Sequence, residues 1–290
     1  MLKTYILTIV TFIAVIPATA HAWGDRAKES KWANTLIKTD IAYGNDDLQK
    51  LDIYAPRGQK ALKPVLIFVH GGGWQRGDKK MAKDHGKFYA DQGIILVSVN
   101  YRLAPKDLHP AQAIDTAAAV KWVYDHISDY GGDKNNIYIS GHSAGAHLVG
   151  LIGTDNKYLA THNLSPTMFK AVFPNDTGSF DFNDPIEKGA RIVQPKIDET
   201  FGTDPVGLAE ASPITYARSN KSFPHFVMFV TAERPDAVRQ TKAFDDALKG
   251  SGAQSEMHVI DGNSHREMNL AMSDPNSPIS KKILEVIWGQ

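Results

Sequence analysis

The chain has 290 residues, no cysteine, and 32 basic against 32 acidic side chains, so its formal net charge at pH 7 is zero. Hydrophobic residues make up 42% of it and charged residues 22%, which is typical of a globular protein and excludes a disordered or fibrous chain. A neutral chain has no overall positive field to attract nucleic acid, so we expect no nucleic-acid partner. No repeat or long linker divides the chain, and we expect one domain after the N-terminal segment.

The first 22 residues have the three parts of a secretory signal peptide. A single basic residue, Lys3, precedes the apolar run 5–16, and a small-residue cleavage site of the A-x-A type ends at Ala22. The apolar run is shorter than the about 20 residues that span a bilayer. We therefore expect cleavage after Ala22 and a periplasmic or secreted mature protein, residues 23–290, with no membrane association.

Short runs rich in β-branched and aromatic residues predict seven strands. They are 51–55, 64–70, 93–101, 136–141, 170–173, 223–230 and 254–260. Apolar residues at helical spacing predict helices at 111–127, 236–248 and 279–288. Several strand runs are continuously apolar, as in a parallel sheet covered on both faces. The alternation of strands and helices predicts a doubly wound α/β fold with a mostly parallel central sheet.

The stretch 177–220 interrupts this alternation. It is polar, contains four prolines and falls between two predicted strands. We expect it to be an insertion over the edge of the sheet, where such segments often cover binding sites.

Residues 141–145 read GHSAG, a G-x-S-x-G motif between a predicted strand and a helix-compatible segment. In this context the motif is typical of a nucleophile elbow, a tight turn in which the two glycines avoid a clash and the serine hydroxyl is exposed. The alternative is an ordinary glycine-rich turn before a helix. We predict Ser143 as the nucleophile.

The run 64–70 leads directly into HGGGW at 70–74. We predict that the backbone amides of Gly72 and Gly73, joined by that of Ala144, form an oxyanion hole, because glycine lets the backbone approach a substrate closely. A phosphate-binding loop is the alternative, but no G-x-x-x-x-G-K-[ST] or G-x-G-x-x-G pattern accompanies the glycines. His70 precedes the serine, so we predict that it anchors this loop and is not the base.

A serine nucleophile needs a histidine base and an orienting acid, expected in the chain order serine, acid, histidine. His265 follows the run 254–260, where a loop delivers it above the sheet, and we predict it as the base. The acid is expected after 223–230. We prefer Glu233, just beyond the strand, and keep Asp236 as the alternative because it could instead cap the next helix. No metal-ligand spacing such as H-E-x-x-H occurs, and we expect no metal and no cofactor.

Four motifs together resemble the bacterial α/β-hydrolase esterases of the hormone-sensitive-lipase-like type, near carbohydrate-ester esterases and kynurenine formamidases. They are HGGGW at 70–74, NYRLAP at 100–105, HPAQAIDTAAAVKWV at 109–123 and GHSAG at 141–145. The resemblance runs from about Leu51 to the C-terminus. It implies the α/β-hydrolase fold and cofactor-free ester hydrolysis, with the roles given above for the serine, the histidine and the oxyanion-hole amides. In family members, the strand that precedes the acid is usually followed by G-x-x-D, and a glutamine lies seven residues beyond that aspartate. Here the position seven residues before Gln240 is Glu233, which the resemblance therefore favours as the acid.

These motifs predict a serine carboxylesterase that hydrolyses short-chain or small carboxylic esters through an acyl-enzyme intermediate. Two alternatives stay open: an arylformamidase or amidase using the same residues, and a non-catalytic binding protein that retains the hydrolase fold. The expected partner is a small-molecule ester.

Overall fold

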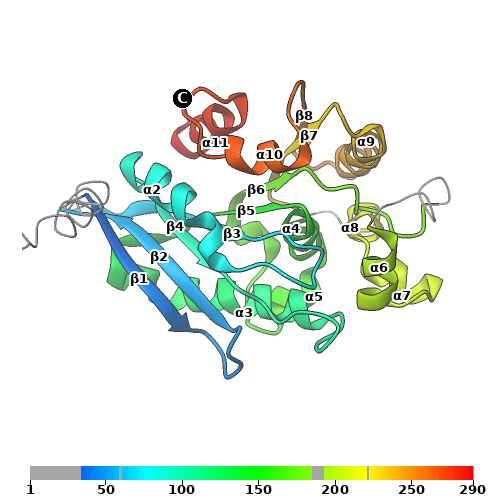
Figure 1. Cartoon of the computed structure of the whole chain (residues 1–290), viewed down its shortest axis with the longest axis horizontal. Helices are drawn as coiled ribbons and strands as arrows, with labels where there is room; N and C mark the ends of the chain where they lie inside the picture. Colours follow the sequence, from blue (N-terminus) through cyan, green and yellow to red (C-terminus); the bar gives the residue numbers. More distant parts are fainter. Residues whose placement is uncertain (1–33, 59–60, 185–192, 221, 290) are drawn as a thin grey trace, which may run out of the picture. The chain divides into compact units, whose positions relative to one another are not determined.

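Eight strands pair into one sheet in the computed structural model, which describes residues 34–58, 61–184, 193–220 and 222–289 (Figure 1). The predicted signal peptide lies outside the described residues. The strands are β1 (Thr35–Ala42), β2 (Lys50–Pro56), β3 (Lys63–Val69), β4 (Ile95–Val99), β5 (Gly132–His142), β6 (Phe169–Asn175), β7 (His225–Thr231) and β8 (Ser255–Ile260).

The order of the strands across the sheet is β1-β2-β4-β3-β5-β6-β7-β8. Strand β2 runs antiparallel to both of its neighbours, and every other pair is parallel. Strands β3 and β4 are buried along their whole length, as expected for parallel strands covered on both faces. The predicted mostly parallel α/β sheet is therefore confirmed.

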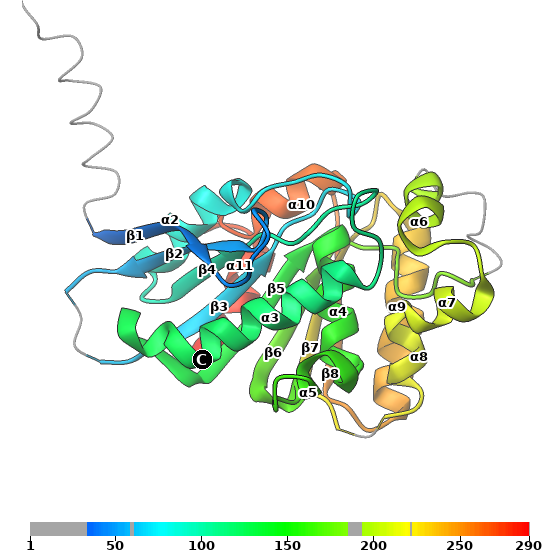
Figure 2. The ribbon, with the colours of Figure 1, turned by 90° about the horizontal axis from the view of Figure 1, so that it is seen from below.

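Helices cover both faces of this sheet. Figures 1 and 2 show α3, α4, α8 and α9 on one face and α2 and α11 on the other. The helices are α2 (Lys83–Asp91), α3 (Ala111–His126), α4 (Ala144–Thr154), α5 (Asn156–Ala160), α6 (Gln194–Phe201), α7 (Pro205–Glu210), α8 (Pro213–Ala217), α9 (Pro235–Gly250), α10 (His265–Ala271) and α11 (Pro278–Trp288), with 3-10 turns η1 (Lys79–Ala82), η2 (Ile127–Tyr130) and η3 (Pro166–Met168). Within the described residues, no helix is long and apolar enough to cross a membrane.

The seven predicted strands and three predicted helices all occur, but the sequence did not predict β1. This strand lies at the edge of the sheet, and only Thr35 of its eight residues is buried. A mostly exposed edge strand lacks the run of apolar residues from which the other strands were predicted.

The expected insertion, in its described parts 177–184 and 193–220, contains three short helices. Helix α8 contacts α4 and α9 and so belongs to the layer that covers the sheet. Helices α6 and α7 lie beside α8 and α9, away from the sheet (Figure 2). The expectation of an excursion therefore holds for α6 and α7 and is wrong for α8, whose buried Ile214 and Ala217 pack into the core.

The start of α4 approaches the end of β3 so closely that only glycine fits at the crossing. A Cβ on Gly145 would lie 2.0 Å from the carbonyl oxygen of Val69, and one on Gly141 would lie 2.4 Å from the carbonyl group of Gly145. Both glycines of GHSAG are thus required by backbone contacts, as the motif predicts.

We expect Gly145→Ala to lower the free energy of unfolding by about 1–3 kcal/mol or more, because the methyl group must push two backbone segments apart. The matched control is Gly250→Ala at the end of α9, where a Cβ meets no atom within 4 Å. The control should be neutral or raise stability by about 0.4–1 kcal/mol. Urea unfolding measures both, and equal effects of the two substitutions would contradict the steric argument.

Candidate active site

Ser143 occupies a sharp turn between β5 and α4. Its backbone has φ 58° and ψ −119°, a left-handed conformation that is strained for a residue with a side chain. The Ser143 amide donates a 3.0 Å hydrogen bond to the carbonyl of Asn175 at the end of β6, which ties the turn to the neighbouring strand. The positive N-terminal end of α4 begins immediately after the serine.

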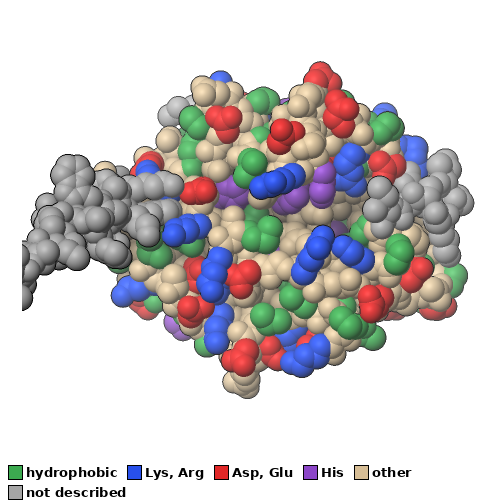
Figure 3. All heavy atoms as spheres, in the orientation of Figure 1, with side chains coloured by type: hydrophobic (Ala, Val, Ile, Leu, Met, Phe, Trp, Pro, Cys, Tyr) green, Lys and Arg blue, Asp and Glu red, His purple; other side chains and the backbone are tan. Residues whose placement is uncertain are grey.

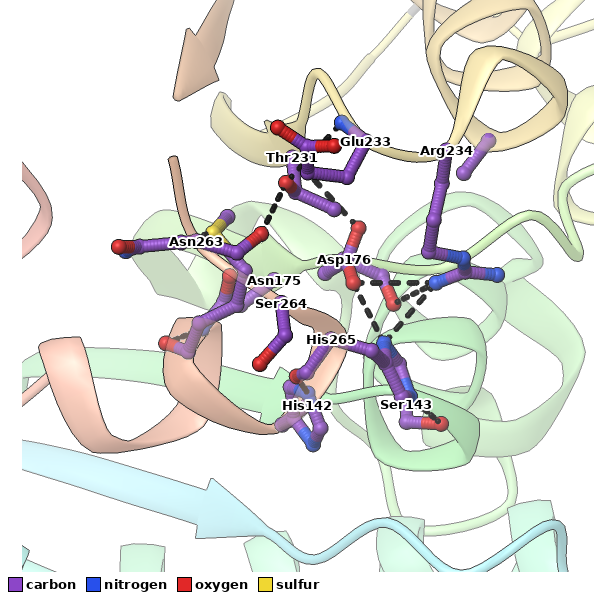
Figure 4. Close-up of polar contacts among 12 residues, drawn as sticks. His142, Ser143, Asn175, Asp176, Thr231, Glu233, Arg234, Asn263, Ser264 and His265 are labelled. Carbon is purple, nitrogen blue, oxygen red and sulfur yellow. Dashed lines mark hydrogen bonds and ion pairs between the residues drawn. The ribbon is translucent and has the colours of Figure 1, made fainter. Parts of the chain in front are cut away.

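Three side chains form a hydrogen-bonded chain at this turn (Figure 4). His265 Nε2 lies 3.0 Å from Ser143 Oγ, and His265 Nδ1 lies 2.5 Å from Asp176 Oδ2. A carboxylate only accepts, so Nδ1 carries the proton and donates it to Asp176, which leaves Nε2 able to accept from the serine hydroxyl. The Asp176 side chain is fully buried and that of His265 is 41% exposed, so solvent reaches the histidine but not the carboxylate.

Asp176 reaches the histidine because it directly follows β6, the neighbour of β5. Its φ of 54° is left-handed, a conformation that aspartate tolerates better than most residues. The Asp176 amide donates to the carbonyl of Phe229 in β7 (2.8 Å), and the Thr231 amide donates to its Oδ1 (3.2 Å). The carboxylate is thereby held at the ends of β6 and β7.

The sequence prediction that Glu233 or Asp236 is the orienting acid is wrong, because the carboxylate that contacts His265 is that of Asp176. Glu233 is exposed, and Figure 4 shows its carboxylate turned away from His265; Asp236 lies in the first turn of α9. The hydrogen bonds of the His265 ring within the described chain involve neither residue. The overlooked signal was the position of Asp176 immediately after the apolar strand residues 171–173 and Pro174-Asn175, where the sequence had suggested only the start of the insertion.

The HGGGW loop lies directly beside Ser143. A Cβ on Gly71 would be 3.0 Å from the Cβ of Ser143, and Gly72 and Gly73 follow with φ values of 130° and 62°. Ala144 is the first residue of α4. The structure thus brings the loop with two of the three predicted oxyanion-hole residues next to the elbow that carries the third.

His70 anchors this loop, as the sequence suggested. Its ring is buried, stacks on Tyr101 with ring centres 4.4 Å apart, and Nδ1 is 2.8 Å from the carbonyl of Gly71. Since a carbonyl accepts, Nδ1 donates. Burial lowers the pKa of His70 to about 4, so the ring is neutral at pH 7.

His142, the second residue of GHSAG, contacts His265 through a hydrogen bond and through its ring. Its Nε2 donates to the carbonyl of His265 at 2.8 Å, and the two ring centres are 4.6 Å apart. Burial lowers the pKa of His142 to about 3, so it adds no positive charge beside His265 at pH 7. This contact fixes the start of α10, where His265 is the first residue.

Aromatic side chains pack around Trp74, the last residue of the HGGGW loop. Trp74 donates from Nε1 to His147 Nδ1 at 3.1 Å, and its ring centre lies 5.9 Å from that of Phe182 and 4.9 Å from that of Phe201. Trp74, His147 and Phe182 are fully buried, so these rings are packed core rather than an open cavity.

Donor atoms of His142, Asp176 and His265 lie within 4.8 Å of one another, close enough in principle to hold a metal ion. The ring nitrogens of His265 and the oxygens of Asp176 are already engaged in the hydrogen bonds described above. The guanidinium of Arg234 lies 3.0 Å from Asp176 and repels a cation there. We assign no metal to this cluster.

A family model and several known proteins match this chain. The family model BD-FAE matches residues 51–248. The chain belongs to the BD-FAE family. This span contains the HGGGW loop, the elbow and Asp176, whereas His265 lies beyond it.

Two relatives illustrate the range of similar sequences. The chain is 31% identical over 270 residues to esterase LipQ of Mycobacterium tuberculosis, which covers 87% of this chain and 63% of LipQ. It is 27% identical over 251 residues to isoprenylcysteine alpha-carbonyl methylesterase ICME of Arabidopsis thaliana, covering 82% of this chain and 58% of that protein. The chain therefore spans less than two thirds of the length of either relative.

A third relative and two solved structures are also similar to this chain. Kynurenine formamidase of Danio rerio is 27% identical over 270 residues, covering 87% of this chain and 83% of the formamidase. Esterase B from Lactobacillus rhamnosis superimposes with a TM-score of 0.74 at 19% identity, covering 93% of this chain and 91% of that one. A truncated carbohydrate esterase from gut microbiota superimposes with a TM-score of 0.72 at 20% identity, covering 88% of this chain and 96% of that one. The structural matches establish the α/β-hydrolase fold.

Within this BD-FAE chain, Arg234 occupies the loop after β7 where the acid was expected. Its Nη1 lies 3.0 Å from Asp176 Oδ2 and 2.9 Å from His265 Nδ1, and it donates to the Asp176 backbone carbonyl at 3.2 Å. Burial by itself raises the pKa of Asp176, but the His265 hydrogen bond and the Arg234 charge outweigh it and hold that pKa below its ordinary value. The carboxylate is therefore ionised at pH 7.

We expect Arg234→Gln to lower the free energy of unfolding by about 1–3 kcal/mol at pH 7, because a buried carboxylate loses its charged partner. The lowered folded-state pKa of Asp176 means that this stabilisation is present above its unfolded-state pKa and is lost as the pH falls through the folded value. The difference between wild type and variant should therefore shrink on acidification.

Arg218→Gln is the control for this measurement, because Arg218 is exposed at the end of α8. It should change stability by less than about 0.5 kcal/mol. Urea unfolding at several pH values measures both variants, and a pH-independent loss in Arg234→Gln would show that the arginine does not stabilise the ionised Asp176.

Proposed function

We propose that the chain is a serine carboxylesterase that hydrolyses short-chain or small carboxylic esters, acting in the periplasm or outside the cell. The observation that carries the proposal is the continuous hydrogen-bonded chain from Ser143 through His265 to Asp176. A nucleophile within 3.0 Å of a base that a buried carboxylate orients is the arrangement that acyl transfer requires. The signal-peptide pattern of residues 1–22 supports the location.

In the proposed mechanism, Ser143 Oγ attacks the ester carbonyl while its proton moves to His265 Nε2. Asp176 holds the ring in the required tautomer and stabilises the positive imidazolium. His265 then protonates the departing alcohol as the tetrahedral intermediate collapses to the acyl-enzyme. Water, activated in turn by His265, attacks the acyl group and releases the carboxylic acid and the free serine.

The oxyanion of each tetrahedral intermediate is assigned to the backbone amides of Gly72, Gly73 and Ala144. Support comes from the position of the HGGGW loop beside Ser143 and from the left-handed backbone of both glycines. Fixed amide donors contribute several kcal/mol, typically about 3–4 for one donor, because they need no reorganisation when charge develops.

Two observations favour small esters. The named relatives LipQ and ICME are an esterase and a methylesterase. Beside the proposed oxyanion hole, Trp74 and Phe182 are fully buried and packed together, so a long acyl chain directed at them would have to displace core side chains. The second candidate, an arylformamidase, is favoured only by the kynurenine formamidase relative.

Hydrolysis of p-nitrophenyl esters from acetate to decanoate tests the proposal. We expect activity on the short esters, and Ser143→Ala and His265→Ala should each lower kcat by about 10^4- to 10^6-fold in folded protein. Folded wild type that is inactive on every ester but cleaves N-formylkynurenine would favour the formamidase. Substantial ester hydrolysis by Ser143→Ala would contradict the serine mechanism.

The role of Asp176 has its own test in a pair of isosteric substitutions. Asp176→Asn should lower kcat by about 10^4-fold, because the amide cannot hold the reactive tautomer of His265. Glu233→Gln, at the exposed position in the next loop, should stay within about twofold of wild type. Circular dichroism confirms folding, and the opposite ranking of the two variants would exclude Asp176 as the orienting acid.

A further inference from the structure

Helix α6 of the insertion is attached directly to the loop proposed as the oxyanion hole. The Gln75 side chain donates to Glu199 Oε2 at 2.6 Å, and the rings of Trp74 and Phe201 meet edge to face at 4.9 Å. The backbone amide of His109 donates to the carbonyl of Thr200 at 3.0 Å. These contacts hold α6 against residues 74–75 and 109, and residues 74–75 belong to or follow the loop whose Gly71 lies beside Ser143.

Lys196, on α6, lies against the backbone of Gly73. The point at which a Cβ of Gly73 would stand is 2.7 Å from Lys196 Cδ and 3.2 Å from its Nζ. The side chain is half-buried, and no hydrogen bond or ion pair joins its ammonium to another residue of the described chain. A cation therefore lies beside the proposed oxyanion hole, and no acidic group of the described residues matches its charge.

Other charged side chains lie on the same face as the site. Arg266 is exposed next to His265, and Figure 3 shows Lys and Arg side chains beside and below the histidines on this face. The charge of Arg234 is matched by Asp176, and Glu199 accepts from Gln75. Glu233 is the exposed carboxylate of the β7 loop. Unlike Arg234, Lys196 has no acidic partner among the residues that the structure describes.

We propose that Lys196 binds a carboxylate that the substrate carries beside its scissile ester bond. The inference rests on the proposed esterase function and specifies its substrate class, an ester of an acid or alcohol with a second, ionised carboxyl group. A half-buried ammonium gains more from a charge-assisted hydrogen bond than one in open solvent does. An ammonium is a compact charge with three donors that can bind a carboxylate oxygen, and the packing of its stem beside Gly73 reduces the side-chain entropy that binding costs.

The test compares phenyl acetate with 3-acetoxybenzoate, two acetate esters that differ by one carboxylate. Lys196→Met keeps the length of the stem and removes the charge, and Lys196→Arg keeps the charge. The control is Lys170→Met, an exposed position in β6 at the opposite end of that strand from Asp176. Thermal unfolding of each variant confirms that it is folded before kinetics are compared.

Lys196→Met should lower kcat/KM for 3-acetoxybenzoate about tenfold, the size of one partly screened charge contact, and change that for phenyl acetate less than twofold. Lys196→Arg should retain most of the preference, and added salt should reduce it in wild type. Lys170→Met should behave as wild type.

Equal effects of Lys196→Met on the two esters, or no effect on either, would overturn the carboxylate-binding role and leave the esterase proposal intact. Wild type that hydrolyses neither ester, although folded, would instead contradict the esterase proposal itself. The two failures are therefore distinguishable in one set of assays.

Discussion

The site depends on the parallel pairing of β3, β5, β6, β7 and β8, whose carboxyl ends lie at the same edge of the sheet. The register aligns Val69 with Gly141 and His142 with Asn175, so the segments that follow these strands emerge side by side. The pairing of the strands alone therefore brings loops that are far apart in the sequence together at that edge. The backbone contact at Gly145 leaves no room for a Cβ. This close packing fixes the path of the chain through Ser143 as it turns from β5 into α4.

The electrostatics of the site follow from the order of the strands. Because β6 lies between β5 and β7, Asp176 is adjacent both to Ser143 and to the loop that carries Arg234. The loop after β7 supplies a cation to the carboxylate instead of supplying the carboxylate itself. A buried acid with two cationic or donor neighbours stays ionised, which is the state needed to orient an imidazole.

The insertion after β6 contacts both the helix layer of the fold and the loop proposed as the oxyanion hole. Gln240 of α9 binds the backbone of Asp181 at 2.8 and 3.0 Å and so fixes the start of this segment. Farther along, α6 packs on the HGGGW loop and carries Lys196 to Gly73. The same segment that departs from the alternation of strands and helices is therefore the one that adds side chains to the proposed substrate site.

The sequence by itself determined the parallel sheet, the elbow with Ser143, the glycine loop and the position of His265 after the last strand. These depend on short-range causes: continuous apolar runs, glycines at close backbone contacts and a histidine beyond a strand end. It missed β1, whose side chains are mostly exposed. It also missed Asp176, since Pro174 and Asn175 end β6 in residues that do not read as strand. Only the tertiary structure decided which carboxylate meets His265, because that depends on which strands are neighbours in the sheet and not on distance along the chain.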